Sequence, residues 1–285
     1  SPKEAAGAVE LGAEGVGLFR TEFLFLDSAT APTVEDQEKQ YTELLQHFPG
    51  KKVVVRALDA GADKPLSFLN DAHEENPALG LRGLRALRVK ENILRDQLTA
   101  LANAQNKTSA DLWVMAPMVS DAEETDYFVA LAKELGIRVA GVMAEVPSLA
   151  LVADQVLETA DFVSIGTNDL TQYTMAADRM LGSVASFQDP WHPAVLQLLA
   201  EGGIGPGPGD DARAVAGADL VLVEVEQRVQ RSGIDIALVD QEPLERAHAQ
   251  LHLGVQGIGR GGRRGHVGMR QGCWKGKASR VLAPV

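Results

Sequence analysis

The sequence predicts a parallel α/β fold in which buried strands alternate with helices around a sheet or a barrel. An apolar content of 45% over 285 residues is enough for one large barrel or two modest domains. Short apolar runs recur along residues 1–201, and amphipathic segments with helix-start signals lie between them. This alternation indicates parallel strands joined by right-handed crossovers. The expected strands lie at residues 15–19, 53–58, 81–86, 112–117, 139–144 and 161–166.

Capping and turn residues predict where the helices begin and end. Thr33 starts a capping box, and apolar residues at helical spacing continue to residue 48. The run from Ser120 to Glu123 repeats this capping pattern for a second helix, which Gly136 should end. Pro147 suits the first turn of a helix that continues to about residue 157. Two further helices are expected at residues 3–13 and 192–201.

Polar side chains follow four of the predicted strands at the point where each strand ends. They are Arg20, Arg56, Glu145 and the adjacent pair Asn168 and Asp169. Because parallel strands present their carboxyl ends on one face, these groups should gather there. Two cations, two carboxylates and an amide at one place indicate a metal-bound anionic substrate.

Charge and composition exclude several classes of protein. The net charge of −12 argues against nucleic acid as the main partner, because phosphate backbones are bound by clustered Lys and Arg. No run approaches the roughly 20 apolar residues of a membrane span, and the start of the chain has no signal region. The single cysteine, Cys273, excludes an internal disulfide. We therefore expect a cytoplasmic protein with no membrane partner.

The composition changes sharply at about residue 202. Residues 1–201 carry 16 Lys and Arg against 30 Asp and Glu, whereas residues 202–285 carry 11 against 9. The second segment also holds 16 of the 28 glycines and no Phe or Tyr. We therefore expect residues 202–285 to be a Gly/Arg-rich tail of a different origin, produced by a shifted reading frame or a chimeric gene. A basic tail that binds nucleic acid is the alternative.

Residues 161–179, from Asp161 to Arg179, carry the most specific motif in the chain. They include DFVSIGTNDLTQY, which resembles the signature of the phosphoenolpyruvate-utilising barrel domain. That domain is shared by enzyme I of the bacterial sugar phosphotransferase system, pyruvate phosphate dikinase and phosphoenolpyruvate synthase. The resemblance is closer to enzyme I in GVGLFRTEFLF (15–25), VRALDAGADK (55–64), ENPALGLR (75–82) and VMAEVP (142–147). It covers about residues 5–201.

The resemblance implies a TIM-like (β/α)8 barrel and a set of site residues. The barrel should be incomplete, because the family's first and last strands are missing from this sequence or replaced. Residues 1–201 would form this truncated domain. Glu145 and Asp169 would bind Mg²⁺ and Asn168 would bind the substrate carboxylate. The resemblance assigns the phosphoryl group to Arg20, Arg56 and Arg179, with Arg82 as a further substrate-binding residue.

The implied activity is that of a phosphoenolpyruvate-protein phosphotransferase that serves sugar uptake. The phosphoryl group would pass to a histidine on a separate amino-terminal domain, which this sequence does not contain, and then to a phospho-carrier protein. The resemblance also implies a homodimer. Two alternatives remain: a fragment of a dikinase or synthase, and an inactive remnant that serves as a dimerisation module.

Two features of the sequence weigh against parts of this assignment. The family's proton-donating cysteine lies in a Gly-x-Cys-Gly-Glu loop, whereas Cys273 is followed by Trp274 and Lys275, so we assign no catalytic residue. Arg20 and Arg56 could instead form salt bridges with Glu22 or Asp59 at the rim of the fold.

Overall fold

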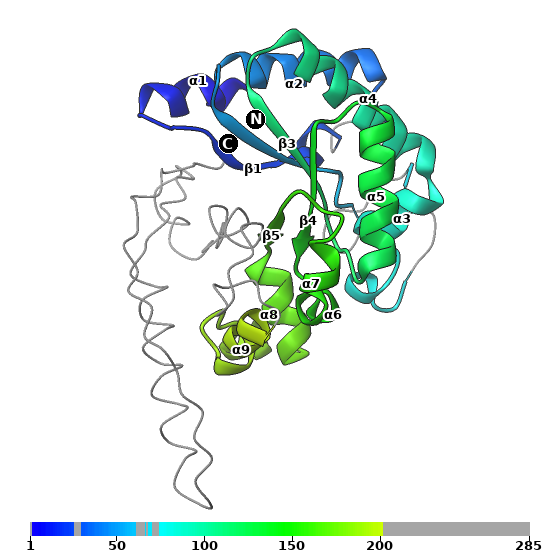
Figure 1. Ribbon diagram of the computed structural model, residues 1–285. Coiled ribbons are helices and arrows are strands. Elements are labelled where there is room, and N and C mark those ends of the chain that lie inside the picture. Colours follow the sequence, from blue (N-terminus) through cyan, green and yellow to red (C-terminus); the bar gives the residue numbers. More distant parts are fainter. Residues whose placement is uncertain (1, 26–29, 61–65, 67, 70–73, 202–285) are drawn as a thin grey trace, which may run out of the picture.

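Five parallel strands form one curled sheet in the computed structural model, which describes residues 2–25, 30–60, 66, 68–69 and 74–201. Strands that are neighbours in the sheet are also consecutive in the chain, in the order β1-β2-β3-β4-β5. The sheet has the form of a curled half-barrel (Figure 1), which confirms the predicted incomplete TIM-like α/β fold. The strands are β1 (Val16–Arg20), β2 (Lys52–Arg56), β3 (Asp111–Ala116), β4 (Val139–Ala144) and β5 (Val163–Ile165).

Helices follow each strand in the part of the chain that the structure describes. Their predicted positions are confirmed at residues 3–13, 33–48, 120–135 and 192–201. The α-helices are α1 (Pro2–Glu10), α2 (Val34–Gln46), α3 (Gly83–Val89), α4 (Glu91–Lys107), α5 (Ala122–Glu134), α6 (Pro147–Leu151), α7 (Ala153–Val156), α8 (Thr167–Met175) and α9 (Pro193–Glu201). Short 3₁₀ helices are η1 (Thr21–Leu24), η2 (Pro77–Leu79) and η3 (Gly182–Phe187).

Two predicted elements differ from the structure. The strand expected at residues 81–86 is wrong, because most of this segment belongs to helix α3. Leu84 and Leu87 are buried and three residues apart, which places them on one face of a helix, and such a short apolar run has no clear period. The helix expected at residues 147–157 is divided at Val152 into α6 and α7.

The two faces of the sheet pack differently because side chains alternate along each strand. Phe19, Val55 and Val142 belong to the large core cluster, which also contains buried side chains of α2, α4 and α5. Leu18 and Val54 face the other way and form a smaller cluster with Met115, Met143 and Phe162. Arg20 and Arg56 lie two residues beyond Leu18 and Val54, so the strand places both arginines on the side of the smaller cluster.

Helix α2 begins with the cap that the sequence predicts. The hydroxyl oxygen of Thr33 accepts a hydrogen bond from the backbone N–H of Asp36 at 3.1 Å. We expect Thr33→Ala to lower the free energy of unfolding by about 0.5–2 kcal/mol, because this N–H then loses its partner. Thr33→Ser keeps the hydroxyl and should remain close to the unmodified chain in urea titrations. An equal loss in both variants would contradict the capping role.

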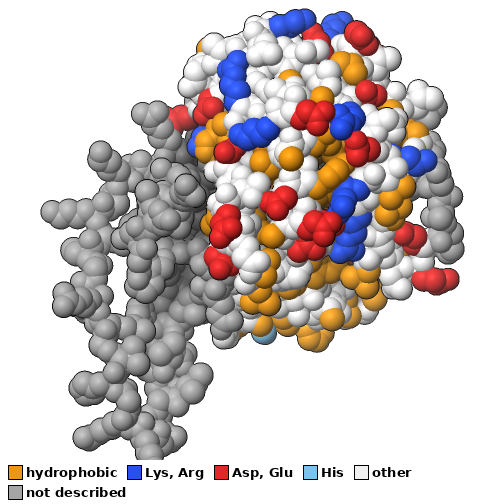
Figure 2. Space-filling model, turned by 45° about the vertical axis from the view of Figure 1, so that its right-hand side comes forward, with side chains coloured by type: hydrophobic (Ala, Val, Ile, Leu, Met, Phe, Trp, Pro, Cys, Tyr) orange, Lys and Arg blue, Asp and Glu red, His pale blue; other side chains and the backbone are white. Residues whose placement is uncertain are grey.

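The surface that carries α3 and α5 has mixed charge. Figure 2 shows Lys and Arg side chains interspersed with Asp and Glu on this face. Arg95, for example, lies 2.7 Å from Glu91 and 3.0 Å from Glu134. None of the described helices has the length and apolar character of a membrane span. The predicted tail at residues 202–285, including Cys273, lies outside the described residues.

Candidate functional site

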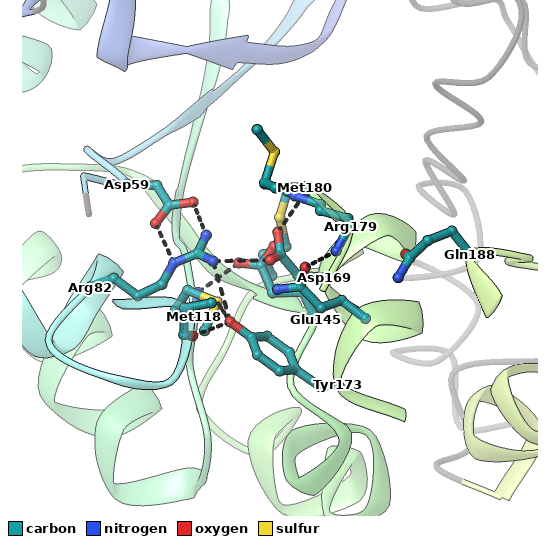
Figure 3. Close-up of polar contacts among 12 residues, drawn as sticks. Asp59, Arg82, Met118, Glu145, Asp169, Tyr173, Arg179, Met180 and Gln188 are labelled. Atoms are coloured by element: carbon teal, nitrogen blue, oxygen red, sulfur yellow. Dashed lines mark hydrogen bonds and ion pairs between the residues drawn. The ribbon is translucent and has the colours of Figure 1, made fainter. Parts of the chain in front are cut away.

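The carboxyl ends of the strands bring the predicted polar residues to one edge of the sheet. Arg20 and Arg56 are direct partners in the pairing of β1 with β2. Glu145 follows the last residue of β4, and Asp169 lies in the first turn of α8, directly after β5. Figure 3 shows Glu145 and Asp169 close together, with the side chains of Arg82 and Arg179 directed toward Asp169. The sequence argument about parallel strands therefore located this cluster correctly.

Arg56 is buried between two carboxylates. Its Nη2 donates to Glu22 Oε1 at 2.5 Å, and its Nη1 lies 3.5 Å from Asp59 Oδ2. Burial alone would lower the pKa of Arg56, but the negative charges of Glu22 and Asp59 raise it well above its ordinary value. Arg56 therefore stays positively charged, and its Nε–H makes no hydrogen bond to the described residues.

Arg82 joins the loop after β2 to the start of α8. Only 3% of the residue is exposed. Nη2 donates to Asp59 Oδ2 at 2.9 Å and Nε lies 3.4 Å from Oδ1 of the same carboxylate. Nη1 donates to Asp169 Oδ1 at 3.0 Å and to the Tyr173 hydroxyl at 3.2 Å (Figure 3). Most of the N–H groups of Arg82 are therefore used to hold other members of the site.

Asp59 connects the two buried arginines. Burial would raise the pKa of Asp59, but the positive charges of Arg56 and Arg82 outweigh it and lower that pKa below its ordinary value. The carboxylate therefore stays ionised and fixes both guanidinium groups at once. Glu22, which is 1% exposed, holds Arg56 from the opposite side.

Asp169 is shared by two arginines. Its Oδ1 accepts from Arg82, and its Oδ2 accepts from Arg179 Nη1 at 3.2 Å. Arg179 is positioned by its own backbone, because its N–H donates to Gln172 Oε1 at 2.8 Å just after α8 ends. The Arg179 side chain is more open to solvent than the buried arginines, at 28% exposed.

Glu145 is a buried carboxyl group under strong constraint. The residue is 1% exposed, and its Oε1 accepts a hydrogen bond from the Met118 backbone N–H at 2.7 Å. A Cβ placed on Gly166 would lie 2.7 Å from both Cβ and Oε2 of Glu145, so only glycine lets β5 approach this closely. Burial first, and then the negative charge of Asp169, raises the pKa of Glu145 to about 8. Arg56 acts against this shift.

The donor set fits a magnesium ion that shares its ligands with substrate. Glu145 and Asp169 repel each other when both are ionised, and this repulsion contributes to the raised pKa of Glu145. A divalent cation between the two carboxylates would relieve it. The described residues contain no cluster of three or more Asp, Glu, His or Cys side chains placed to hold a metal. A usual magnesium site takes one or two carboxylates from the protein, and substrate phosphate oxygens and water complete its coordination. Glu145 and Asp169 are the residues that could hold such an ion.

The raised pKa of Glu145 predicts a pH dependence of stability for the metal-free chain. Between its ordinary value of 4.5 and about 8, the folded chain holds a proton on Glu145 that the unfolded chain has released. The stabilising contribution is therefore complete below pH 4.5 and is lost as the pH rises through about 8. Urea titrations from pH 5 to pH 9 should show this decline, and Glu145→Gln should flatten it. A decline of equal slope in Glu145→Gln would contradict the assignment.

The structure places the remaining predicted residues at the same edge but in other surroundings. Arg20 ends β1 and its guanidinium lies 5.3 Å from the centre of the Phe23 ring. Asn168 is half-buried in the first turn of α8, directly before Asp169. The salt bridges considered for Arg56 are present, since both Glu22 and Asp59 contact it, although the pairs are buried rather than at a rim. The substrate-binding role of Arg56 stays a prediction.

Sequence reasoning missed two groups that contact the site. Tyr173 accepts from Arg82 and donates to the backbone carbonyl of Ala78, and Met118 donates to Glu145. Tyr173 lies four residues after Asp169 on α8, so helical spacing could have placed it on the same face. Met118 acts through its backbone, and no side-chain pattern indicates that.

Comparisons with known proteins cover the part of the chain that carries this site. The family described as "PEP-utilising enzyme, PEP-binding domain" matches residues 1–202. A phosphoenolpyruvate-protein phosphotransferase of Streptomyces coelicolor is 56% identical over 201 residues, which are 70% of this chain and 36% of that protein. Proteins of the same name from Latilactobacillus sakei and Staphylococcus aureus strain MSSA476 are 40% and 41% identical, with 70% of this chain covered and 36% and 37% of theirs.

The chain thus spans little more than a third of the length of these curated relatives. The matched range agrees with the resemblance expected for about residues 5–201, and these three relatives carry the name that the enzyme I resemblance implied. The chain belongs to the family of PEP-utilising enzymes and matches it through the PEP-binding domain.

Proposed function

We propose that this chain binds phosphoenolpyruvate together with Mg²⁺, as the PEP-binding part of an enzyme I-type phosphoenolpyruvate-protein phosphotransferase. One observation carries the proposal. Arg56, Arg82 and Arg179 converge on Asp59 and Asp169 beside Glu145, at the edge of the sheet where all the strands end. Such a set matches a small phosphorylated acid, since arginines suit phosphate and carboxylates suit its metal ion.

The carboxylates and the arginines have separate tasks in this proposal. Glu145 and Asp169 would hold the ion, which when bound neutralises negative charge on the phosphoryl oxygens. Arg56 and Arg179 would contact the phosphoryl group, because Arg56 Nε has no partner among the described residues and Arg179 is partly open to solvent. Arg20, at the end of the neighbouring strand, would contribute from the side of β1.

Arg82 would bind substrate less directly than the other arginines. Its hydrogen bonds to Asp59, Asp169 and Tyr173 occupy most of its donors. We infer that it keeps Asp169 oriented and adds positive charge near the phosphoryl group. Asn168 would donate from its amide to the substrate carboxylate, as the family resemblance implies.

The proposed reaction transfers the phosphoryl group to a protein histidine. The bond between phosphorus and the enol oxygen breaks, a bond from phosphorus to an imidazole nitrogen forms, and the enolate of pyruvate leaves. This chain would form no covalent bond to the phosphoryl group, because catalysis of phosphoryl transfer depends mainly on positioning and charge neutralisation. We propose three partners: the domain that carries the acceptor histidine, a phospho-carrier protein, and a second copy of this chain in a homodimer. The donor of the proton to the enolate stays unassigned.

Isothermal titration of the full chain with phosphoenolpyruvate tests the proposed function. We expect saturable heat in the presence of Mg²⁺ and much less heat when EDTA replaces the metal, because ion and substrate share their ligands. Pyruvate, which lacks the phosphoryl group that the arginines would hold, is the control ligand and should bind far more weakly. Absence of heat from phosphoenolpyruvate with Mg²⁺ would favour the inactive-remnant alternative.

A further inference from the structure

Met118 has an unusual backbone conformation beside the proposed site. Its φ angle is 55°, in the left-handed region that residues with a side chain adopt only at a cost in free energy. Ala176, at the end of α8, is the other described non-glycine residue with positive φ, and there the conformation ends a helix. Met118 instead lies in the loop between β3 and α5, where no helix requires it.

The surroundings hold this loop in place. The carbonyl of the preceding Pro117 accepts from the Leu84 N–H at 3.3 Å. Two residues after Met118, Ser120 accepts from Arg85 Nη2 through its hydroxyl at 2.9 Å and from the Ser148 hydroxyl through its carbonyl at 2.8 Å. The conformation of Met118 is therefore fixed from both sides.

The Met118 side chain is also enclosed. Only 2% of the residue is exposed, and a Cβ added to Gly83 would come within 2.6 Å of Met118 Cβ and 2.8 Å of its Cγ. Its sulfur lies 4.0 Å from the Tyr173 hydroxyl (Figure 3). Gly83 directly follows Arg82, so the Met118 side chain packs beside the segment that carries this arginine, while the Met118 N–H contacts Glu145.

The consequence of this conformation is the hydrogen bond to Glu145. The Met118 N–H donates to Oε1 at 2.7 Å, inside a region where almost no water reaches either residue. Rotating φ to the usual negative range would move the N–H relative to the rest of the loop. The buried carboxyl group of Glu145 would then lose the hydrogen bond that Met118 donates to it.

We propose that Met118 is a positioning residue for the metal-binding carboxylate: its left-handed backbone fixes Glu145 Oε1, so that Oε2, on the side of Gly166, is turned toward a divalent cation. This rests on the proposed function, because it assumes that Glu145 holds the ion. The role belongs to the backbone conformation, and the side chain serves to keep it.

Leucine and isoleucine variants at position 118 test this directly. The two side chains contain the same atoms, but a β-branched residue tolerates positive φ far worse than an unbranched one. We expect Met118→Leu to bind Mn²⁺ within about threefold of the unmodified chain. Met118→Ile should bind Mn²⁺ about 10–100-fold more weakly, as when the partner of a metal ligand is removed. Binding is measured by electron paramagnetic resonance of free Mn²⁺, with folding checked by circular dichroism.

Equal Mn²⁺ affinity of folded Leu and Ile variants would overturn the proposal. Should the Ile variant not fold, Met118→Gly decides, because glycine adopts positive φ readily and keeps the N–H. The proposal expects Met118→Gly to retain Mn²⁺ affinity. Loss of affinity in that variant, with its fold intact, would show that the side chain and not the backbone matters.

A measurement without metal separates this inference from the proposed function. In chain labelled with ¹⁵N-methionine, the Met118 amide proton should resonate downfield, because it donates a short hydrogen bond of 2.7 Å to Glu145 Oε1. Glu145→Gln should move that resonance upfield, and an unchanged resonance would overturn the hydrogen bond on which the inference depends. If the unmodified chain binds no Mn²⁺ while the resonance does move, the proposed metal site fails and the backbone arrangement stands.

Discussion

Asp169→Asn is expected to abolish the heat of phosphoenolpyruvate binding in the presence of Mg²⁺. Asparagine has nearly the same shape as aspartate, but it carries no charge and is a poor magnesium ligand. The carboxylate oxygens of Asp169 also accept from Arg82 and Arg179, so both arginines lose their ionised partner together. Loss of the charged contact to the metal, at about 1.5–3 kcal/mol, and the altered positions of the two arginines should together lower the affinity at least about 100-fold.

The fold of the Asp169→Asn chain should survive. Removing this charge relieves the repulsion that raises the pKa of Glu145, and that gain opposes the loss of the two ion pairs. Asp154→Asn is the matched control, because Asp154 is exposed on α7 and lies outside the cluster. Isothermal titration and urea unfolding of both variants check the prediction. Normal heat from Asp169→Asn would show that this carboxylate has no part in binding.

Arg82→Met should cause the largest loss of stability among single substitutions at the site. Methionine fills a similar volume, but it leaves Asp59 and Asp169 buried without the cation that contacts both. Breaking a buried ion pair by removing one partner typically costs about 3–5 kcal/mol, because the remaining charge stays away from water. The free energy of unfolding in urea measures this effect directly.

Arg88→Met on α3, the helix that begins directly after Arg82, is the control for that measurement. The Arg88 side chain is 37% exposed, and its carboxylate partners Glu123 and Glu124 lie 3.6 Å and 3.9 Å away. Arg88 and Glu123 form a pair of exposed side chains, and such pairs contribute about 0–1 kcal/mol, because water and salt screen them. A cost for Arg82→Met no greater than that for Arg88→Met would contradict the buried network.

The position of the site could be predicted from the sequence because it follows from the strands alone. Each of β1, β2, β4 and β5 is a short apolar run, and the residue type after each run is visible in the sequence. Parallel pairing then brings Arg56, Glu145 and Asp169 to one edge with no further information. The motif at residues 161–179 added the family, and the matched relatives confirm that part.

The connections between those residues could not be predicted in the same way. Arg82 comes from a segment expected to be a strand, and its contacts with Asp59 and Asp169 join residues 23 and 87 positions apart. The sequence suggests Glu22 and Asp59 only as partners at the rim, because a sequence shows neither burial nor which carboxylate contacts which arginine. The Met118 N–H belongs to the backbone, so residue types give no sign of it.

The central claim is that Glu145 and Asp169 share one divalent cation beside the arginines. Crystals of the full chain grown with Mn²⁺ and phosphoenolpyruvate test it through anomalous scattering at the manganese edge. The account predicts one strong peak between the two carboxylates, at about 2.0–2.3 Å from an oxygen of each, with phosphate oxygens completing the coordination. A peak bound to neither Glu145 nor Asp169, or phosphoenolpyruvate held elsewhere without metal, would contradict it.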